Sequence, residues 1–267
     1  MKPSIAVIDL VVLCWLGPAG VAQQRQTTEA FDQYVTKTEA RIAQTRAKAD
    51  SFSAVDALAP AQRTQTMARL QQGEVVIEKQ GETPTSIPGG LIHDWVGTVF
   101  IPKTTIGKVL SLIQDYDHSN RHYSPDVMQS RQLSHHGDDF QVFMRLKKHK
   151  VITVVLDTEY DVHYGRLDAA HQYSISRSTR VSEVEDPGTL NEHVLAAGHD
   201  HGFMWRLNSY WAFEQVGNDV LIECEAISLT RDIPAGLGWM IGPFVNSIPR
   251  ESLQFTLEST RKALAPK

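Results

Sequence analysis

The sequence predicts an α+β fold in which a curved antiparallel sheet wraps around a long C-terminal helix. Three observations predict it. Strand-like segments with alternating apolar and polar residues follow one another closely over 127–229. A helical pattern precedes them over 103–116, and another closes the chain over about 249–264. Because one face of an antiparallel sheet has to be covered, we expect the closing helix to lie across that face.

Composition excludes one class of partner. The chain has 267 residues, 42% of them hydrophobic and 21% charged, as in ordinary globular proteins. Its formal net charge is -5 and its pI is near 6.1. Since binding of nucleic acid needs a concentrated basic surface, we expect no nucleic-acid partner.

Residues 1–22 have the pattern of a signal peptide. Lys2 precedes a short apolar run, and the small residues at 20–22 suit cleavage after Ala22. The run is too short for a permanent transmembrane helix. We therefore expect an exported protein, periplasmic or secreted. Its remaining cysteine, Cys224, lies in an apparent strand and is expected to be buried.

Residues 23–72 predict a helical extension ahead of the sheet domain, which is expected to span 73–267. A second helix is expected over 59–72, where Pro60 suits a helix start. Over 25–52 a weakly amphipathic helix is expected from the spacing of Phe31, Val35, Thr38, Ile42 and Ala49.

Beyond Gly73 the sequence predicts mainly strands and places one set of side chains on the concave face of the sheet. The expected strands are 73–80, 91–102, 127–134, 139–147, 151–164, 171–184, 203–213 and 220–229, with a loop over 83–90. Period-two alternation assigns to the concave face Phe140, Val142, Met144, Leu146, Ile152, Val154, Leu156, Tyr160, Val162 and Tyr164.

The stretch DHGFMWRLNSYWAF carries aromatic bulk at every second position. Phe203, Trp205, Leu207 and Trp211 share one side of the expected strand, and Ser209 adds a hydroxyl between them. Such a face either fills a core or forms the wall of a cavity with a few polar groups.

Arg177 alternates with serines in the strand HQYSISRSTRVSEV. A buried arginine needs an anionic partner. Glu223 or Glu225 on the neighbouring strand region is expected to supply it, and a ligand carboxylate or phosphate is the alternative.

The order of these elements resembles the helix-grip proteins, which comprise START lipid-transfer domains, the polyketide cyclase and dehydrase group and pollen-allergen-like proteins, together called the SRPBCC superfamily. The resemblance covers about 73–264 and is carried by GTVFIP, IGKVLSLIQDYDHSNRHYSPDV, YWAFEQVGNDVLIECEAISLTRDIP and IPRESLQFTLESTRKAL. It implies a deep apolar pocket for lipids, sterols, polyketides or other hydrophobic small molecules. It does not imply which ligand, because this fold hosts carriers, sensors and enzymes.

Residues and resemblance together predict an exported binding or transfer protein for a hydrophobic small molecule, in particular a lipid. The expected ligand-binding residues are Val142, Met144, Val154, Leu156, Tyr160, Arg177, Phe203, Trp205, Leu207, Ser209 and Trp211. The stretch PAGLGWMIGPF joins glycines and prolines to large apolar residues, which suits a gate that touches membrane lipids. The expected gate residues are Leu237, Trp239, Met240 and Ile241. Packing beneath the closing helix is the alternative.

Two other functions stay open. A filled core, with the N-terminal helices holding a partner, would give an interaction protein. The loop 115–123 offers acid–base groups to an enzyme of the cyclase or hydrolase kind through Tyr116, Asp117, His118, His122 and Tyr123. The sequence shows no nucleophile elbow and no zinc signature, so we expect no catalytic residue, no metal and no cofactor.

Overall fold

The computed structural model describes residues 18–48, 51–150, 152–196, 198–233 and 238–265. In chain order its elements are α1 (Pro18–Arg46), α2 (Pro60–Gln71), β1 (Val76–Lys79), β2 (Thr85–Ile87), β3 (Gly90–Ile101), α3 (Ile106–Ile113), the 3-10 helix η1 (Tyr116–His118), α4 (Asn120–Tyr123), β4 (Val127–His136), β5 (Asp139–His149), β6 (Thr153–Arg166), β7 (His171–Glu185), β8 (His193–Val194), β9 (Arg206–Val216), β10 (Asp219–Arg231) and α5 (Gly238–Leu264).

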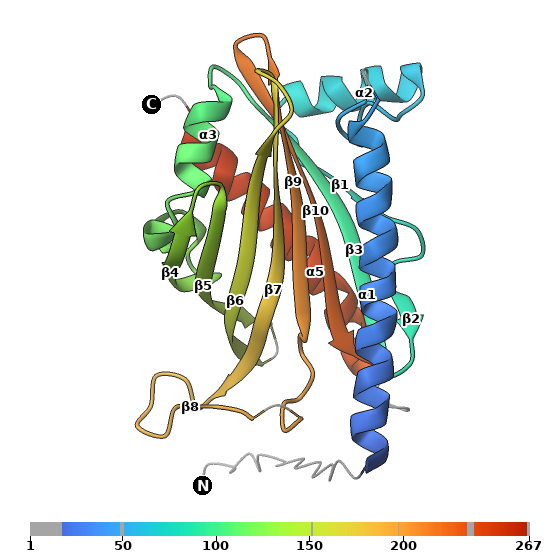
Figure 1. Cartoon of the computed structure of the whole chain (residues 1–267), viewed down its shortest axis with the longest axis vertical. Coiled ribbons are helices and arrows are strands. Elements are labelled where there is room, and N and C mark those ends of the chain that lie inside the picture. Colours follow the sequence, from blue (N-terminus) through green and yellow to red (C-terminus); the bar gives the residue numbers. More distant parts are fainter. Residues whose placement is uncertain (1–17, 49–50, 151, 197, 234–237, 266–267) are drawn as a thin grey trace, which may run out of the picture.

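The described strands form one curved antiparallel sheet with α5 across its concave face (Figure 1), so the predicted α+β helix-grip architecture is confirmed. The strand order is β1-β3-β10-β9-β7-β6-β5-β4, with β2 added to β3 and β8 added to β7. Residues 83–90 are expected as a loop, but 85–87 pair with β3 as a short strand. Strand β9 begins at Arg206 rather than at residue 203.

The closing helix is longer than the sequence predicts. A start near residue 249 is expected because proline suits a first helical turn. In the structure α5 already begins at Gly238 and contains both Pro243 and Pro249. Proline inside a helix removes one backbone hydrogen bond but does not have to end the helix. The residues of the expected flexible stretch from Gly238 onward are therefore helical.

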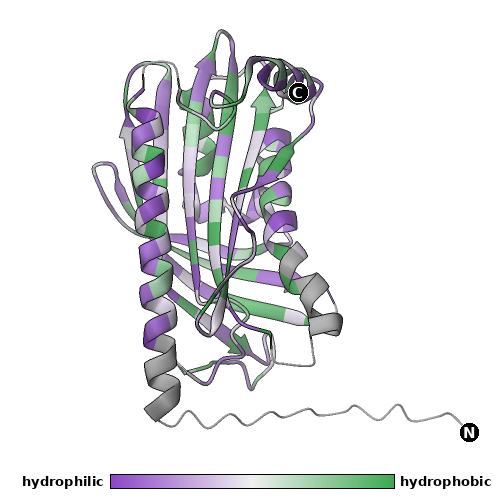
Figure 2. Ribbon diagram, turned by 90° about the vertical axis from the view of Figure 1, so that its right-hand side faces the viewer, coloured by the Kyte–Doolittle hydropathy of each residue, from purple (hydrophilic) through white to green (hydrophobic). Residues whose placement is uncertain are grey.

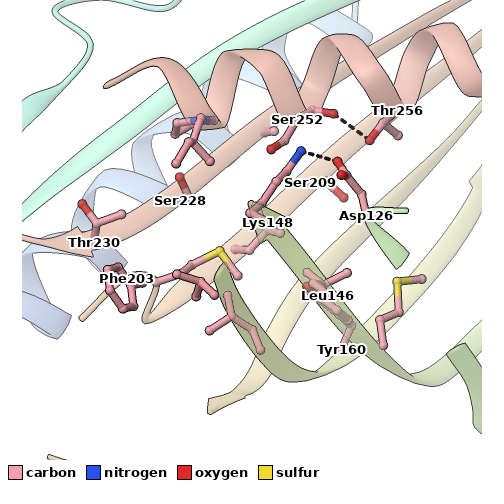
Figure 3. Close-up of a pocket in the computed structure, with 18 of the residues that line it drawn as sticks. Asp126, Leu146, Lys148, Tyr160, Phe203, Ser209, Ser228, Thr230, Ser252 and Thr256 are labelled. Carbon is pink, nitrogen blue, oxygen red and sulfur yellow. Dashed lines mark hydrogen bonds and ion pairs between the residues drawn. The ribbon is translucent and has the colours of Figure 1, made fainter. Parts of the chain in front are cut away.

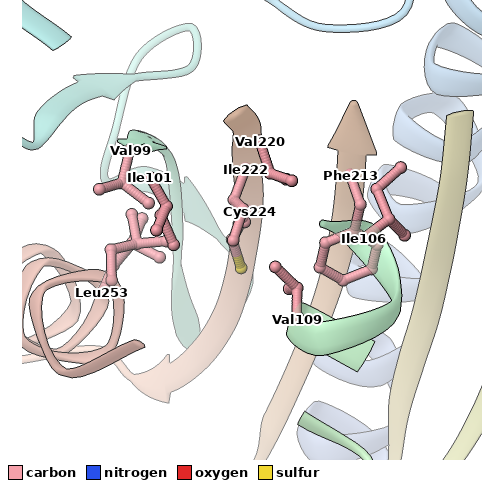
Figure 4. Close-up of a cluster of buried hydrophobic side chains, with 10 residues drawn as sticks. Val99, Ile101, Ile106, Val109, Phe213, Val220, Ile222, Cys224 and Leu253 are labelled. Atoms are coloured by element: carbon pink, nitrogen blue, oxygen red, sulfur yellow. The ribbon is translucent and has the colours of Figure 1, made fainter. Parts of the chain in front are cut away.

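Helix α5 packs on the sheet through one apolar cluster (Figure 4). Leu253 and Leu257 of the helix lie among side chains of β3, β9 and β10 and are almost completely buried. Gly97 of β3 makes this approach possible. A Cβ atom at Gly97 would lie 2.4 Å from Cδ1 of Leu257 and 2.7 Å from Cδ1 of Ile77.

Helix α1 covers the opposite, convex face of the sheet (Figures 1 and 2). Phe31 and Val35 pack with Ile92 of β3, Tyr210 of β9 and Ile227 of β10, and further described residues join this outer cluster. The predicted stripe of the first helix is confirmed for Phe31, Val35, Thr38 and Ile42, and Ala49 lies outside the described residues.

Beneath α1 the convex face carries buried carboxyl groups. Tyr34 of α1 donates a hydrogen bond to Asp94 of β3 over 2.8 Å, and Arg41 of α1 pairs with Glu225 of β10. The backbone N–H of Ala54 donates to Glu223 over 2.7 Å. Burial, then the neighbouring carboxylate of Glu225, raises the pKa of Asp94 well above its usual range. Burial raises the pKa of Glu223 to about 8.

Replacing Gly97 with alanine is expected to lower the free energy of unfolding by about 1–3 kcal/mol, because the new Cβ overlaps two buried side chains. Gly107→Ala in α3 is the matched control, since a Cβ there meets no atom closer than 3.9 Å, and a helical alanine stabilises by about 0.5–1 kcal/mol relative to glycine. Urea unfolding of both variants measures the difference. Equal stability of the two variants would contradict the close approach of α5.

Stability is expected to fall as the pH rises toward 9. Asp94 and Glu223 bind protons more tightly in the folded chain than in the unfolded chain, where carboxyl pKa values are near 4. The stabilisation of the folded chain that comes from these two raised pKa values is therefore complete below about pH 4 and is lost as the pH rises through about 8. Thermal unfolding at pH 6 and pH 9 measures it, and Asp94→Asn should flatten the dependence. Glu82→Gln, at an exposed carboxyl, should leave it unchanged, and a flat wild-type profile would contradict the assignment.

Candidate functional site

A cavity of about 1330 Å³ lies between the concave face of the sheet and α5 (Figure 3). Strands β5, β6, β7, β9 and β10 form its floor, α5 forms its roof, and η1 and α4 contribute to its wall. The apolar part of the wall includes Ile113, Val127, Val142, Met144, Leu146, Val154, Leu156, Val162, Phe203, Met204, Leu207, Trp211, Ala226, Ile233, Val245, Ile248, Pro249, Leu253 and Phe255.

The cavity extends along the strands. Tyr164, Ser174, Trp211 and Cys224 form one cross-strand row at one end, and all four line the cavity. Thr230 lies further along β10 and also lines it; the stretch of extended strand from Cys224 to Thr230 is about 20 Å long. A ligand that fills this space is therefore elongated or large.

Nine of the eleven predicted ligand-binding residues line this cavity. They are Val142, Met144, Val154, Leu156, Tyr160, Phe203, Leu207, Ser209 and Trp211. The period-two patterns of β5, β6 and β9 bring these side chains together because successive residues of a strand point to opposite faces. Phe203 belongs to the loop before β9 and is 40% exposed, so it lies where the wall meets solvent.

Trp205 does not line the cavity, which corrects the prediction. Its indole N–H donates to Asp200 over 2.7 Å, and its ring packs on the outer cluster beside α1. The alternation that relates residue 205 to Leu207 holds only inside the strand, and β9 begins at Arg206. The aromatic face of the sequence is therefore divided between the two sides of the sheet.

Arg177 also lies outside the cavity. Its Nε lies 2.7 Å from Oε1 of Glu39 on α1, and the arginine side chain is 49% exposed. The hydroxyl of Tyr210 donates to the same carboxylate over 2.9 Å. The expectation of an internal ion pair is correct, but neither Glu223 nor Glu225 is the partner. Sequence alone could not place α1 on this face, so the partner was missed.

The predicted gate lies largely outside the described residues. Leu237 is not described, and the backbones of Trp239, Met240 and Ile241 form the first turns of α5, while their side chains are not described. The next part of the helix lines the cavity through Val245, Ile248 and Ser252, among others. The gate role stays a prediction.

Several polar wall residues were not predicted. Ser174 and Ser176 on β7 line the floor, and their alternation opposite Arg177 was the signal that could have found them. Lys148 and Asp126 form an ion pair that faces Ser252 and Thr256 of α5 (Figure 3). Lys148 continues the period-two series of Val142, Met144 and Leu146 on β5, which was the signal that could have found it, whereas Asp126 precedes β4 and follows no strand pattern.

The loop before β9 also contributes to the wall through His199, Asp200 and His201, among others. Nδ1 of His201 lies 2.8 Å from Glu183, which also accepts the backbone N–H groups of His201 and Phe203. In the described part of the chain, no group of three His, Cys, Asp or Glu side chains is arranged to hold a metal ion. Nor does a helix there have both the length and the apolar character needed to span a bilayer.

The loop 115–123 contributes phenols to the cavity rather than acid–base pairs. Tyr116 and Tyr123 line it together with Ser119. His118 pairs instead with Asp115 over 2.8 Å, and Asp117 accepts the backbone N–H of Gln132; neither histidine of this loop lines the cavity.

Four tyrosines give the cavity wall neutral hydroxyl groups. Burial raises the pKa of Tyr160 to about 12 and raises the pKa values of Tyr116, Tyr123 and Tyr164 above the ordinary range. Cys224 is buried as predicted, and burial raises the pKa of its thiol. All these groups therefore keep their protons at neutral pH.

No family model and no curated protein matches the chain. Solved structures do match it. The STAR-related lipid transfer protein of Xanthomonas axonopodis is 18% identical over 71% of this chain and 98% of that chain, with a TM-score of 0.44. The human StarD13 (DLC2) lipid transfer and protein localization domain is 11% identical over 79% and 99% of the two chains, with a TM-score of 0.43.

The Zhui aromatase/cyclase of Streptomyces sp. R1128 is 12% identical over 65% of this chain and 93% of that chain, with a TM-score of 0.41. The structures similar to this chain thus include START and cyclase proteins, the groups that its sequence resembles. At these identities the similarity concerns the fold.

Proposed function

We propose that this protein binds and carries a hydrophobic small molecule of the lipid class, without chemistry on it. The single observation that carries the proposal is the 1330 Å³ cavity between the sheet and α5. Pockets for drug-sized ligands measure about 300–1,000 Å³, so this space suits a larger or longer molecule. The lining is mostly apolar with a few polar groups, which is the composition of a small-molecule site.

Affinity would come mainly from burial of apolar ligand surface, at about 25 cal/mol per Å². Ser209 and Tyr160 lie among the apolar wall residues and would orient a polar group of the ligand. The proposal includes export, periplasmic or secreted, which rests on the leader pattern of residues 1–22.

The mature protein is expected to purify with an apolar molecule bound at about one per chain. Native mass spectrometry detects the adduct, and organic extraction identifies its chemical class. A cavity of this size with an apolar wall favours occupation, because an empty one forfeits contacts and apolar burial. A protein that stays empty after exposure to mixed lipids would contradict the proposal.

Narrowing the cavity with a large side chain is expected to weaken binding. Ser176→Trp on β7 places an indole on the cavity floor, and affinity for the apolar dye N-phenyl-1-naphthylamine should fall by roughly tenfold or more. Thr179→Trp on the same strand is the matched control, because residue 179 is exposed and does not line the cavity. Unchanged dye binding by a folded Ser176→Trp variant would show that the dye binds elsewhere.

A further inference from the structure

Two tyrosine hydroxyls meet at one end of the cavity. The hydroxyl of Tyr116 on η1 lies 2.7 Å from the hydroxyl of Tyr164 on β6, and each residue is only 5% exposed. Both residues line the cavity and belong to one apolar cluster with Phe140, Val142 and other neighbours. The pair is therefore a small polar feature in an apolar wall.

This pair of hydroxyls has one O–H donor that is not used within the pair. Each phenol carries one O–H group, and one of the two donates to the other. Among the described residues, neither hydroxyl has another hydrogen-bond partner. The second O–H group is thus available to an acceptor in the cavity, and a buried donor without an acceptor is costly.

The third phenol at this end has no such donor to spare. The hydroxyl of Tyr123 lies 3.0 Å from Oγ1 of Thr260, and that threonine hydroxyl donates to the carbonyl of Thr256 over 2.8 Å. Because the single proton of Thr260 is already used, Tyr123 is the donor in their hydrogen bond. Tyr123 and the Tyr116–Tyr164 pair therefore differ in what they offer a ligand.

The surroundings of the pair favour an uncharged acceptor. The ion pair of Lys148 and Asp126 is far away, because Lys148 is in register with Val154, at the opposite end of β6 from Tyr164. Burial and neighbouring phenols, rather than charged groups, shift the pKa values of Tyr116 and Tyr164 upward. A buried carboxylate or phosphate there would lack a cationic partner, whereas a carbonyl oxygen needs only a donor.

We propose that the Tyr116–Tyr164 pair donates a hydrogen bond to a ketone or ester carbonyl oxygen of the ligand. This rests on the proposed function, since it assigns one chemical group of the molecule that the cavity holds. The pair fixes the orientation of the bound ligand: the carbonyl-bearing end lies against η1 and β6, and the rest of the molecule extends along the strands toward Thr230.

A comparison of two probes tests this inference. The ketone 2-pentadecanone and the alkane pentadecane displace N-phenyl-1-naphthylamine from the wild type and from the Tyr116→Phe/Tyr164→Phe double variant. The ratio of the ketone affinity to the alkane affinity is expected to fall about three- to tenfold in the double variant, because the loss of one hydrogen bond between uncharged groups weakens binding by about this factor. Tyr123→Phe, which removes a phenol oxygen but no spare donor, should leave the ratio unchanged.

Each outcome has a defined meaning. A ratio that the double variant does not change, or that Tyr123→Phe lowers equally, overturns the carbonyl site while leaving the carrier function intact. Failure of the wild type to bind the dye and any added lipid removes the proposed function itself, and the carbonyl site with it. The double replacement keeps the side-chain shapes and removes both partners of one hydrogen bond, so a nearly unchanged unfolding temperature is expected.

A second readout is made on the wild type, with Tyr123→Phe as its control. The infrared carbonyl band of 2-pentadecanone bound to the wild type should lie at lower frequency than in liquid alkane, because a hydrogen bond weakens the C=O bond. The Tyr123→Phe protein should show the same shift. A band at the alkane position in the wild type would overturn the proposal.

Discussion

A single helix cannot cover the concave face of a sheet this wide, and the cavity follows from that constraint. An α-helix with its side chains is about 10–12 Å across, whereas adjacent strands are about 4.8 Å apart, so one helix covers only two or three strands. Helix α5 packs on β3 and its neighbours through Leu253 and Leu257. The described side chains of that α5 cluster come from β3, β9, β10 and α3, so side chains of β5, β6 and β7 instead line the space beneath α5, which forms the cavity.

The convex face of the sheet is covered in a different way, by a helix packed directly on it. Helix α1 lies along it and closes an apolar cluster around Phe31 and Tyr210, but it also covers the carboxyl groups of Asp94 and Glu225. Buried carboxyl groups need hydrogen-bond donors or protons. Tyr34 and Arg41 supply the donors from the helix, so α1 is held by specific polar contacts as well as by burial. The convex face is therefore packed against a helix, whereas the concave face borders the cavity.

Near Trp211 the cavity offers neutral donors in an apolar wall, whereas charged side chains such as Glu185, Asp200 and Arg231 line its other end. Tyrosine and serine hydroxyls line the part of the floor near Trp211, and the Lys148–Asp126 ion pair is confined to the part where β5 approaches α5. In the loop 115–123, His118 pairs with Asp115 and Asp117 accepts a backbone N–H group, and neither His118 nor His122 lines the cavity. The side chains of this loop that line the cavity are those of Tyr116, Ser119 and Tyr123.

The sequence alone determined the strands, the faces of most of their side chains and the closing helix, because period-two and helical patterns are local consequences of backbone geometry. Val142, Leu156 and Ser209 were assigned to the cavity on that basis, and the structure places them there. Only the tertiary structure decided where local periodicity ends and which elements meet. Trp205 lies one residue before β9 and packs against the outer cluster. Arg177 forms an ion pair with Glu39, which lies on a helix far away in the sequence. The pairing of Tyr116 with Tyr164 likewise depends on where η1 docks against β6, a contact between distant segments that no local spacing encodes.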